Sequence, residues 1–335
     1  MKQVQIKGET YNLYDPRTLV NVDKDLAYHK GEAGNESWYI VANLDSNGHK
    51  IGLHLQALIM RDVVSLNLSV VNETTQWYKS FEYIYNINDI KVNTRIFEIE
   101  AKDFYFSGNA DQIIAKVNIP GAAIDIITEK ACEPLLFNCE GYTDFLGAKQ
   151  YDFAFPRMIT KGTITMDSEV YHVNGIAWFD RQWGDLPDLS KNVIPAVGNK
   201  PASHFEGLQW VWLNPQLSNG VNISFGEIVI MSHKLATAFA TIAYPDGATT
   251  YAPAEFLERS DFWISEATGN KYPTHFILTI PHKNTKLEIN VPYKEQEILS
   301  KVGNIYEGMA NINGIFEGEQ VTGLAYAEMA GDWKQ

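Results

Sequence analysis

The chain has 335 residues, of which 45% are hydrophobic and 20% are charged, a composition typical of globular proteins and not of disordered ones. This length allows two domains, each with a sizeable core. The formal net charge of −14 would repel a phosphate backbone, and no Lys/Arg-rich run is present to bind an anionic membrane, so nucleic acid is excluded as an expected partner.

The N-terminus carries no apolar signal-peptide core, and no stretch reaches the ~20 apolar residues that a membrane-spanning helix needs. We therefore expect a soluble, cytoplasmic protein. Cys132 and Cys139 are the two cysteines and form no CxxC motif. Two ordinary thiols fit a reducing compartment, but a disulfide between them stays open at this point. The sequence also leaves the oligomeric state open.

Short runs of β-forming residues alternate with turn residues along the first half of the chain. Residues 37–43 and 51–58 flank the turn cluster 45–48, which predicts a hairpin. In the second of these strands His54 and Gln56 share one face, because side chains alternate with period two. Further strands are expected at 64–71, 94–97, 104–107, 113–119, 123–128, 162–166 and 170–177.

The second half of the chain repeats this pattern. Residues 208–213 and 221–228 are expected to pair across the turn 217–220, and Pro245-Asp-Gly247 marks another turn. Further strands are expected at 236–244, 249–251, 275–280, 286–291, 304–315 and 320–329, and a short helical turn at 294–301. Trp210 and Trp212 are two residues apart and should lie on one face of one strand.

Regularly spaced short strands are typical of sandwiches and barrels. Residues 185–200 contain Pro and Gly without a clear period, which is typical of a connection between domains. We therefore predict an all-β protein of two antiparallel, lipocalin-like barrels or half-barrels. The expected organisation is an N-terminal domain at 1–184, a connection at 185–203 and a C-terminal domain at 204–335.

Familiar enzyme motifs are missing from the sequence. It has no GxGxxG, no phosphate-binding loop, no HExxH and no GxSxG, and its eight His residues are scattered. No metal and no cofactor are therefore expected.

Clusters of aromatic and carboxylate residues are the remaining candidates for chemistry. A carboxyl group held against indole rings loses hydration, so its pKa rises and it can donate a proton at neutral pH. An aromatic wall stabilises developing positive charge by cation–π attraction. These features suit hydration, isomerisation or cyclisation of a polyene. The clusters are Glu36-Ser-Trp-Tyr39, Trp178-Phe-Asp-Arg-Gln-Trp-Gly184, Tyr306-Glu-Gly308 and Tyr326-Ala-Glu328.

Each cluster also has a purely structural interpretation. Asp180 can form an internal ion pair with Arg181, and Glu36 can cap a turn. The tryptophans can belong to the core, the carboxylates at 307 and 328 can lie on outward strand positions, and His54 can be a hydrogen-bonded strand residue.

The four motifs resemble those of the carotenoid 1,2-hydratase (hydroxyneurosporene synthase) superfamily, which includes AttH-like bacterial proteins and fungal decalin-forming Diels–Alderases. The central Gly175-Ile-Ala-Trp-Phe-Asp-Arg-Gln-Trp-Gly184 resembles its Gly-x-(Ala/Gly)-Trp-(Met/Phe)-Asp-x-x-Trp-Gly. Glu36-Ser-Trp-Tyr39, Tyr306-Glu-Gly308 and Gly323-Leu-Ala-Tyr-Ala-Glu-Met-Ala-Gly331 resemble its other motifs in the same order. The resemblance implies two lipocalin-like domains with a ligand cavity in or between them.

The resemblance assigns the role of proton donor to Asp180, and no cofactor is implied. Where the hydratases carry His after the Asp-containing core, this chain has Arg181 and Gln182. We predict a cofactor-free isomerase, cyclase or hydratase acting on a hydrophobic polyene, terpenoid or polyketide-like molecule in a pocket at the domain junction. A non-catalytic carrier is the alternative, and a hydrolase would lack a nucleophile motif. The expected catalytic residues are Asp180 and Glu36, and the expected substrate-binding residues are Trp38, Gln56, Trp178, Trp183, Trp210, Glu307 and Tyr326.

Overall fold

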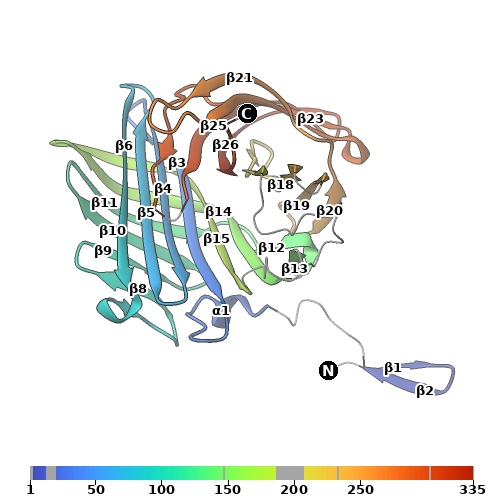
Figure 1. The fold of residues 1–335 in the computed structure, drawn as a ribbon. Coiled ribbons are helices and arrows are strands. Elements are labelled where there is room, and N and C mark those ends of the chain that lie inside the picture. The colour runs from blue at the N-terminus through green and yellow to red at the C-terminus, as the bar shows by residue number, and fades with distance from the viewer. Residues whose placement is uncertain are drawn as a thin grey trace, which may run out of the picture.

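The computed structural model describes residues 3–12, 20–145, 148–185, 207–231, 234–301 and 303–334. Within them, strands dominate and every strand pairing is antiparallel, which confirms the predicted all-β class. Two curved sheets form two half-barrels that lie side by side (Figure 1). No helix in these ranges is long and apolar enough to span a membrane.

The first sheet has 13 strands among the described residues. Its edges do not pair with each other, so the half-barrel is open. In spatial order it runs β6 (Trp77–Asn86), β5 (Val63–Asn72), β4 (His49–Met60), β3 (Asn35–Ser46), β15 (Glu169–Gly184), β14 (Ala148–Met166), β11 (Ala122–Lys130), β10 (Gln112–Ile119), β9 (Phe104–Gly108), β8 (Phe97–Ala101) and β7 (Lys91–Val92), with β12 (Leu135–Leu136) and β13 (Tyr142–Phe145) also paired to β14.

The second sheet has 11 strands in the described part of the chain. It is open as well. Its order is β20 (Thr249–Pro253), β19 (Leu235–Ala243), β18 (Asn222–Ile230), β16 (Leu208–Leu213), β26 (Glu319–Gly331), β25 (Ile305–Phe316), β23 (Thr285–Asn290), β22 (Lys271–Ile280) and β21 (Glu258–Ile264), with β17 (Gln216–Leu217) beside β18 and β26, and β24 (Glu297–Ile298) beside β25.

Few elements lie outside these sheets. The hairpin of β1 (Gln3–Ile6) and β2 (Glu9–Asn12) extends away from both half-barrels, and the short helix α1 (Val22–Asp25) lies at one end of the first (Figure 1). In the described ranges, three 3-10 turns connect strands: η2 (Ile87–Asp89), η3 (Phe137–Cys139) and η5 (Pro281–Lys283). Cys132 and Cys139 are free thiols.

The predicted hairpins are present, but two local expectations were wrong. Residues 94–96 form a bend, and the strand begins at Phe97. Residues 294–301 form no helical turn, because the buried carboxylate of Glu297 is bound by side chains from 265–272 and this segment pairs with β25 instead. The strand predicted at 162–166 is present as the end of a longer strand, β14, which starts at Ala148. It passes Pro156 through a register shift between Phe155 and Met158, the kind of irregularity that accommodates a residue without a backbone N–H.

Each half-barrel encloses its own apolar core, and a third apolar cluster lies between them. We call this third cluster the junction. It consists of Tyr39, Val41, Val71, Leu135, Ala154, Trp178, Trp212, Ala243, Met309 and Tyr326. The predicted connection 185–203 lies almost wholly outside the described residues, so the predicted division into domains stays a prediction.

Candidate active site at the junction of the half-barrels

The central motif reaches the junction through strand alternation. On β15, Ala177, Phe179 and Trp183 point into the first core, so Trp178 and Asp180 point toward the second half-barrel. Trp178 is fully buried and donates its indole N–H to Asp180 Oδ1 at 2.7 Å. Asp180 itself is only half-buried. The motif therefore supplies a partly exposed carboxyl group on the face of β15 that turns toward the second half-barrel.

The second half-barrel presents Glu307 on β25, and this side chain is fully buried. Tyr39 on β3 donates its hydroxyl to Glu307 Oε2 at 2.8 Å, which joins the two half-barrels directly. His54 on β4 lies on the same side, with its Nε2 3.6 Å from Glu307 Oε1. The His54 ring packs against Tyr39 with 5.1 Å between ring centroids.

A second indole–carboxyl pair comes from β16 and β26. Trp210 donates its indole N–H to Glu328 Oε1 at 2.7 Å, and both side chains are half-buried. Trp210 packs against the junction, and Trp212 belongs to it, which confirms that the two share one face of their strand. Each half-barrel thus contributes one carboxyl group held by an indole N–H.

Burial decides the charge of these carboxyl groups. Loss of hydration raises the pKa of Asp180 and of Glu307 well above their ordinary values, and repulsion from Glu328 adds to both shifts. Burial raises the pKa of Glu328 to about 7. Burial at the junction therefore favours the protonated form of these carboxyl groups, and a protonated carboxyl group can serve as a general acid.

The side chains around these carboxyls are aromatic. Trp212 meets Trp178 and Tyr39 edge-on, with 5.7 Å between ring centroids in each case. Tyr326 and Met309 reach over β4 at Gly52, where a Cβ atom would come within 2.5 Å of the Tyr326 hydroxyl. Faces of such rings attract positive charge, so the junction can stabilise a cation next to a proton donor.

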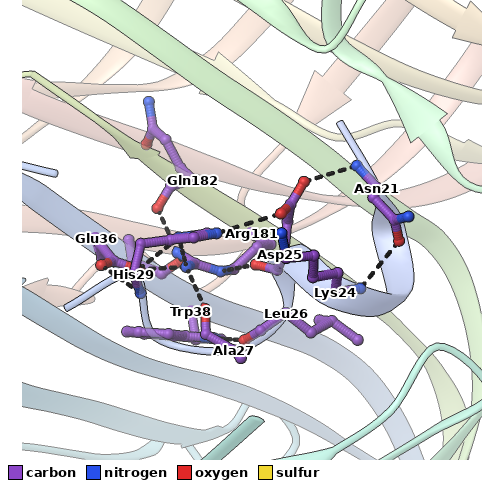
Figure 2. Close-up of polar contacts among 11 residues, drawn as sticks. Asn21, Lys24, Asp25, Leu26, Ala27, His29, Glu36, Trp38, Arg181 and Gln182 are labelled. Atoms are coloured by element: carbon purple, nitrogen blue, oxygen red, sulfur yellow. Dashed lines mark hydrogen bonds and ion pairs between the residues drawn. The ribbon is translucent and has the colours of Figure 1, made fainter. Parts of the chain in front are cut away.

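Three of the predicted site residues lie elsewhere. Glu36, Trp38 and Trp183 point into the first half-barrel, where they surround Arg181. Figure 2 shows Glu36 and Trp38 beside Arg181. The Arg181 guanidinium is fully buried, with its carbon 4.1 Å from the Trp38 ring centroid and 5.0 Å from that of Trp183. It forms an ion pair with Glu36. Asp180 and Arg181 therefore do not form the internal ion pair considered from the sequence, because neighbours on a strand face opposite sides.

The Arg181 cluster fastens the segment around α1 to the sheet. Arg181 Nε donates to the carbonyl of Asp25 at 2.8 Å, and its Nη2 donates to the carbonyl of Ala27 at 3.0 Å. The backbone N–H of His29 donates to Glu36 Oε1 at 2.9 Å (Figure 2). Within the described part of the chain, the hydrogen bonds and ion pairs of the Glu36 side chain are with His29 and Arg181, and neither of these is a junction residue.

The structure thus brings Asp180, Trp178, Trp210, Glu307 and Tyr326 together at the junction. Gln56 lies on the same face of the first sheet, half-buried, and donates to Ser37 Oγ at 3.1 Å. Sequence reasoning did not assign Tyr39, His54, Trp212 or Glu328 to the site. The two-residue spacing from Trp210 to Trp212 and from Tyr326 to Glu328 was the signal that would have included Trp212 and Glu328. Tyr39 carried no such signal, because it faces away from its predicted neighbours Glu36 and Trp38.

The candidate ligands for a metal ion are His, Cys, Asp and Glu side chains. In the described ranges, no three His, Cys, Asp or Glu side chains are grouped as a metal site requires.

The AttH-like family model matches residues 64–332. No curated protein sequence is significantly similar to this chain. Among solved structures, a protein of Nitrosomonas europaea described as an AttH has 16% identity and a TM-score of 0.77, with 93% of this chain and 97% of that chain covered. Kievitone hydratase of Nectria haematococca has 17% identity and a TM-score of 0.77, with 94% of each chain covered. CghA, solved with Sch210972, has 12% identity and a TM-score of 0.61, with 90% and 89% covered. These likenesses concern the fold.

Proposed function

Because the chain belongs to the AttH-like family, we propose that it is an enzyme of the hydratase or cyclase type that binds a hydrophobic small molecule between its half-barrels. The observation that carries this proposal is the half-buried carboxyl group of Asp180. Burial raises the pKa of this group and so favours its protonated form, the indole of Trp178 fixes its orientation, and aromatic rings lie beside it. Kievitone hydratase shares the fold over 94% of both chains.

The proposed reaction starts with a proton transfer. Asp180 gives its proton to one carbon of a substrate double bond, and the other carbon becomes cationic beside the faces of Trp178 and Trp212. In a hydration, a water molecule adds to that carbon and loses a proton to a carboxylate. In a cyclisation, a second double bond of the substrate attacks the cation instead, and a carbon atom of the product then loses a proton to the same carboxylate. Transfer of a proton from that carboxyl group back to Asp180 restores both groups. Both sequences return the protein to its starting charge.

Glu328 is the proposed base in this scheme. Its pKa of about 7 leaves a substantial ionised fraction at neutral pH, whereas the pKa of Asp180 is raised by burial and by repulsion from Glu328. Two carboxyl groups with separate ionisation behaviour can divide the roles of acid and base. Asp180 is preferred to Glu307 as the acid because Asp180 is held beside the indole of Trp178, whereas Glu307 is bound by Tyr39 and faces His54.

The test is product analysis after incubation with a panel of polyene and prenylated compounds in water labelled with heavy oxygen. A labelled water adduct identifies a hydratase, and an isomer of unchanged mass identifies a cyclase or isomerase. Asp180→Asn should lower turnover by about 10²–10⁴-fold. Binding without any chemical change across the panel would reject the enzyme and leave a carrier.

Asp167→Asn is the matched control for this test. Asp167 accepts an indole N–H from Trp77 at 2.9 Å, as Asp180 does from Trp178. This hydrogen bond is exposed, and neither Asp167 nor Trp77 belongs to the junction. Turnover should be unchanged in this variant. An equal loss in both variants would show that the Asp180 effect is not specific to the junction.

A further inference from the structure

Buried polar atoms without a partner gather on the junction face of the first sheet. His54 is 0% exposed, and neither of its ring nitrogens makes a hydrogen bond within the described part of the chain. The side-chain oxygens of Asn43 on β3 and Asn67 on β5 are also buried without a partner there. Strand alternation places these residues on the same face as Tyr39 and Val71. Native proteins keep few such atoms, so their concentration on one face indicates a partner that comes from outside the chain.

Glu307 faces this group from the second half-barrel. Its Oε1 has no hydrogen-bond partner among the described residues, while Tyr39 holds its Oε2. The distance of 3.6 Å from Oε1 to His54 Nε2 is too long for a hydrogen bond. The two side chains are therefore close together, fully buried and not bonded to each other.

Burial favours the uncharged form of both groups. Burial lowers the pKa of His54 to about 3, and burial together with repulsion from Glu328 raises the pKa of Glu307 well above its ordinary value. A neutral imidazole has one donor and one acceptor nitrogen, and a protonated carboxyl group also has both capacities. The pair is therefore matched to a neutral oxygen group and not to an ion.

The apolar part of the junction adjoins this polar pair. Tyr39 contacts the His54 ring on one side and meets Trp212 edge-on at 5.7 Å on the other, and Trp212 meets Trp178 at the same centroid distance. One end of the site is thus polar and uncharged, and the other end is aromatic.

We propose that the ligand of the junction is an oxygenated hydrophobic molecule whose hydroxyl or carbonyl oxygen hydrogen-bonds to His54 and Glu307 while its apolar body lies against Trp178 and Trp212. This inference rests on the proposed function for the location of the site, and it narrows the substrate class by excluding pure hydrocarbons. It also makes His54 a binding residue, a role that the sequence did not suggest.

The experiment measures binding of two matched probes, farnesol and farnesene, by quenching of tryptophan fluorescence. We expect farnesol to bind at least about tenfold more tightly, because a site built to bond a hydroxyl group rejects the analogue without it. His54→Phe and Glu307→Gln should reduce this preference to near unity. His275→Phe is the control, because His275 lies on β22 and bonds Ser260 and Glu288 on the partly exposed outer surface.

Two further readouts keep the test decisive. His54→Phe should have a thermal midpoint at or above that of the unchanged protein, because no hydrogen bond is lost when an unpartnered ring is replaced. The ¹⁵N resonances of the His54 ring should move on addition of farnesol and stay in place with farnesene.

Equal binding of both probes, tighter binding of farnesene, or binding of neither would overturn the inference. A farnesol preference that survives in His54→Phe would also overturn it. These outcomes do not depend on turnover. If instead the protein prefers farnesol to farnesene, loses this preference in His54→Phe, and changes no compound of the panel chemically, then the proposed function fails and the present inference stands.

Discussion

Asp180 and Arg181 are adjacent on β15, yet their side chains face opposite sides of the first sheet. Asp180 accepts a hydrogen bond from Trp178 at the junction, whereas Arg181 is buried under Trp38 and paired with Glu36. One motif therefore supplies both a candidate acid and an arginine that holds the segment around α1 against the sheet. This arrangement separates the residues whose loss should affect chemistry from those whose loss should affect folding.

The Arg181–Glu36 pair should act on stability. Arg181→Met leaves the carboxylate of Glu36 buried and unpaired and removes bonds to the carbonyls of 25–29, so the free energy of unfolding should fall by about 3–5 kcal/mol. Urea denaturation measures this change. The double variant Arg181→Met/Glu36→Gln should recover part of the loss, because the unpaired charge is gone.

Glu36→Gln also tests the catalytic role that the sequence suggested for Glu36. We expect kcat per folded molecule to stay unchanged, since the carboxylate contacts Arg181 and His29 and not the junction. A large loss of kcat at unchanged stability would restore Glu36 as a catalytic residue.

Glu328 should make the protein less stable as the pH rises. Its pKa is about 7 in the folded protein and near the ordinary 4.5 in the unfolded chain, so its contribution to stability is fully present below pH 4.5 and is lost as the pH rises toward about 7. Because the side chain is half-buried, the loss should be on the order of 2 kcal/mol at most. Chemical denaturation at several pH values measures it.

Glu328→Gln is expected to remove this part of the pH dependence. The difference in unfolding free energy between the unchanged protein and the variant should vary across pH 4.5–7 and become constant above that range. A constant difference across the whole range would mean that Glu328 ionises normally.

Gly52 should control how closely the half-barrels approach. A Cβ at this position would lie 2.5 Å from the Tyr326 hydroxyl and 2.6 Å from Val71 Cγ1. Gly52→Ala should therefore lower the free energy of unfolding by about 1–3 kcal/mol through overpacking. The same change in a Tyr326→Phe background should cost less, because the nearest clashing atom is absent. Equal costs in both backgrounds would argue against close packing of Tyr326 over β4.

Local chemistry in the sequence determined much of the fold. Turn residues such as Asn47-Gly48 and Asp167-Ser168 fixed hairpins that the structure contains, and period-two alternation predicted strands. It also predicted that Trp210 and Trp212 share a face. The helical turn expected at 294–301 failed because Glu297 is held by a tertiary network that no local pattern encodes.

The site depended on tertiary structure. Composition and motifs selected Asp180, Glu307, Trp178 and Tyr326 as candidates, but the sequence had no means to show which sheet face would be covered by the other half-barrel. The antiparallel register between β3 and β15 places Glu36 beside Trp183 and Tyr39 beside Asp180, and alternation then sends these pairs to opposite faces. Which face becomes the junction was decided by the packing of β25 and β26 over β3 and β4, a long-range contact between residues more than 250 positions apart.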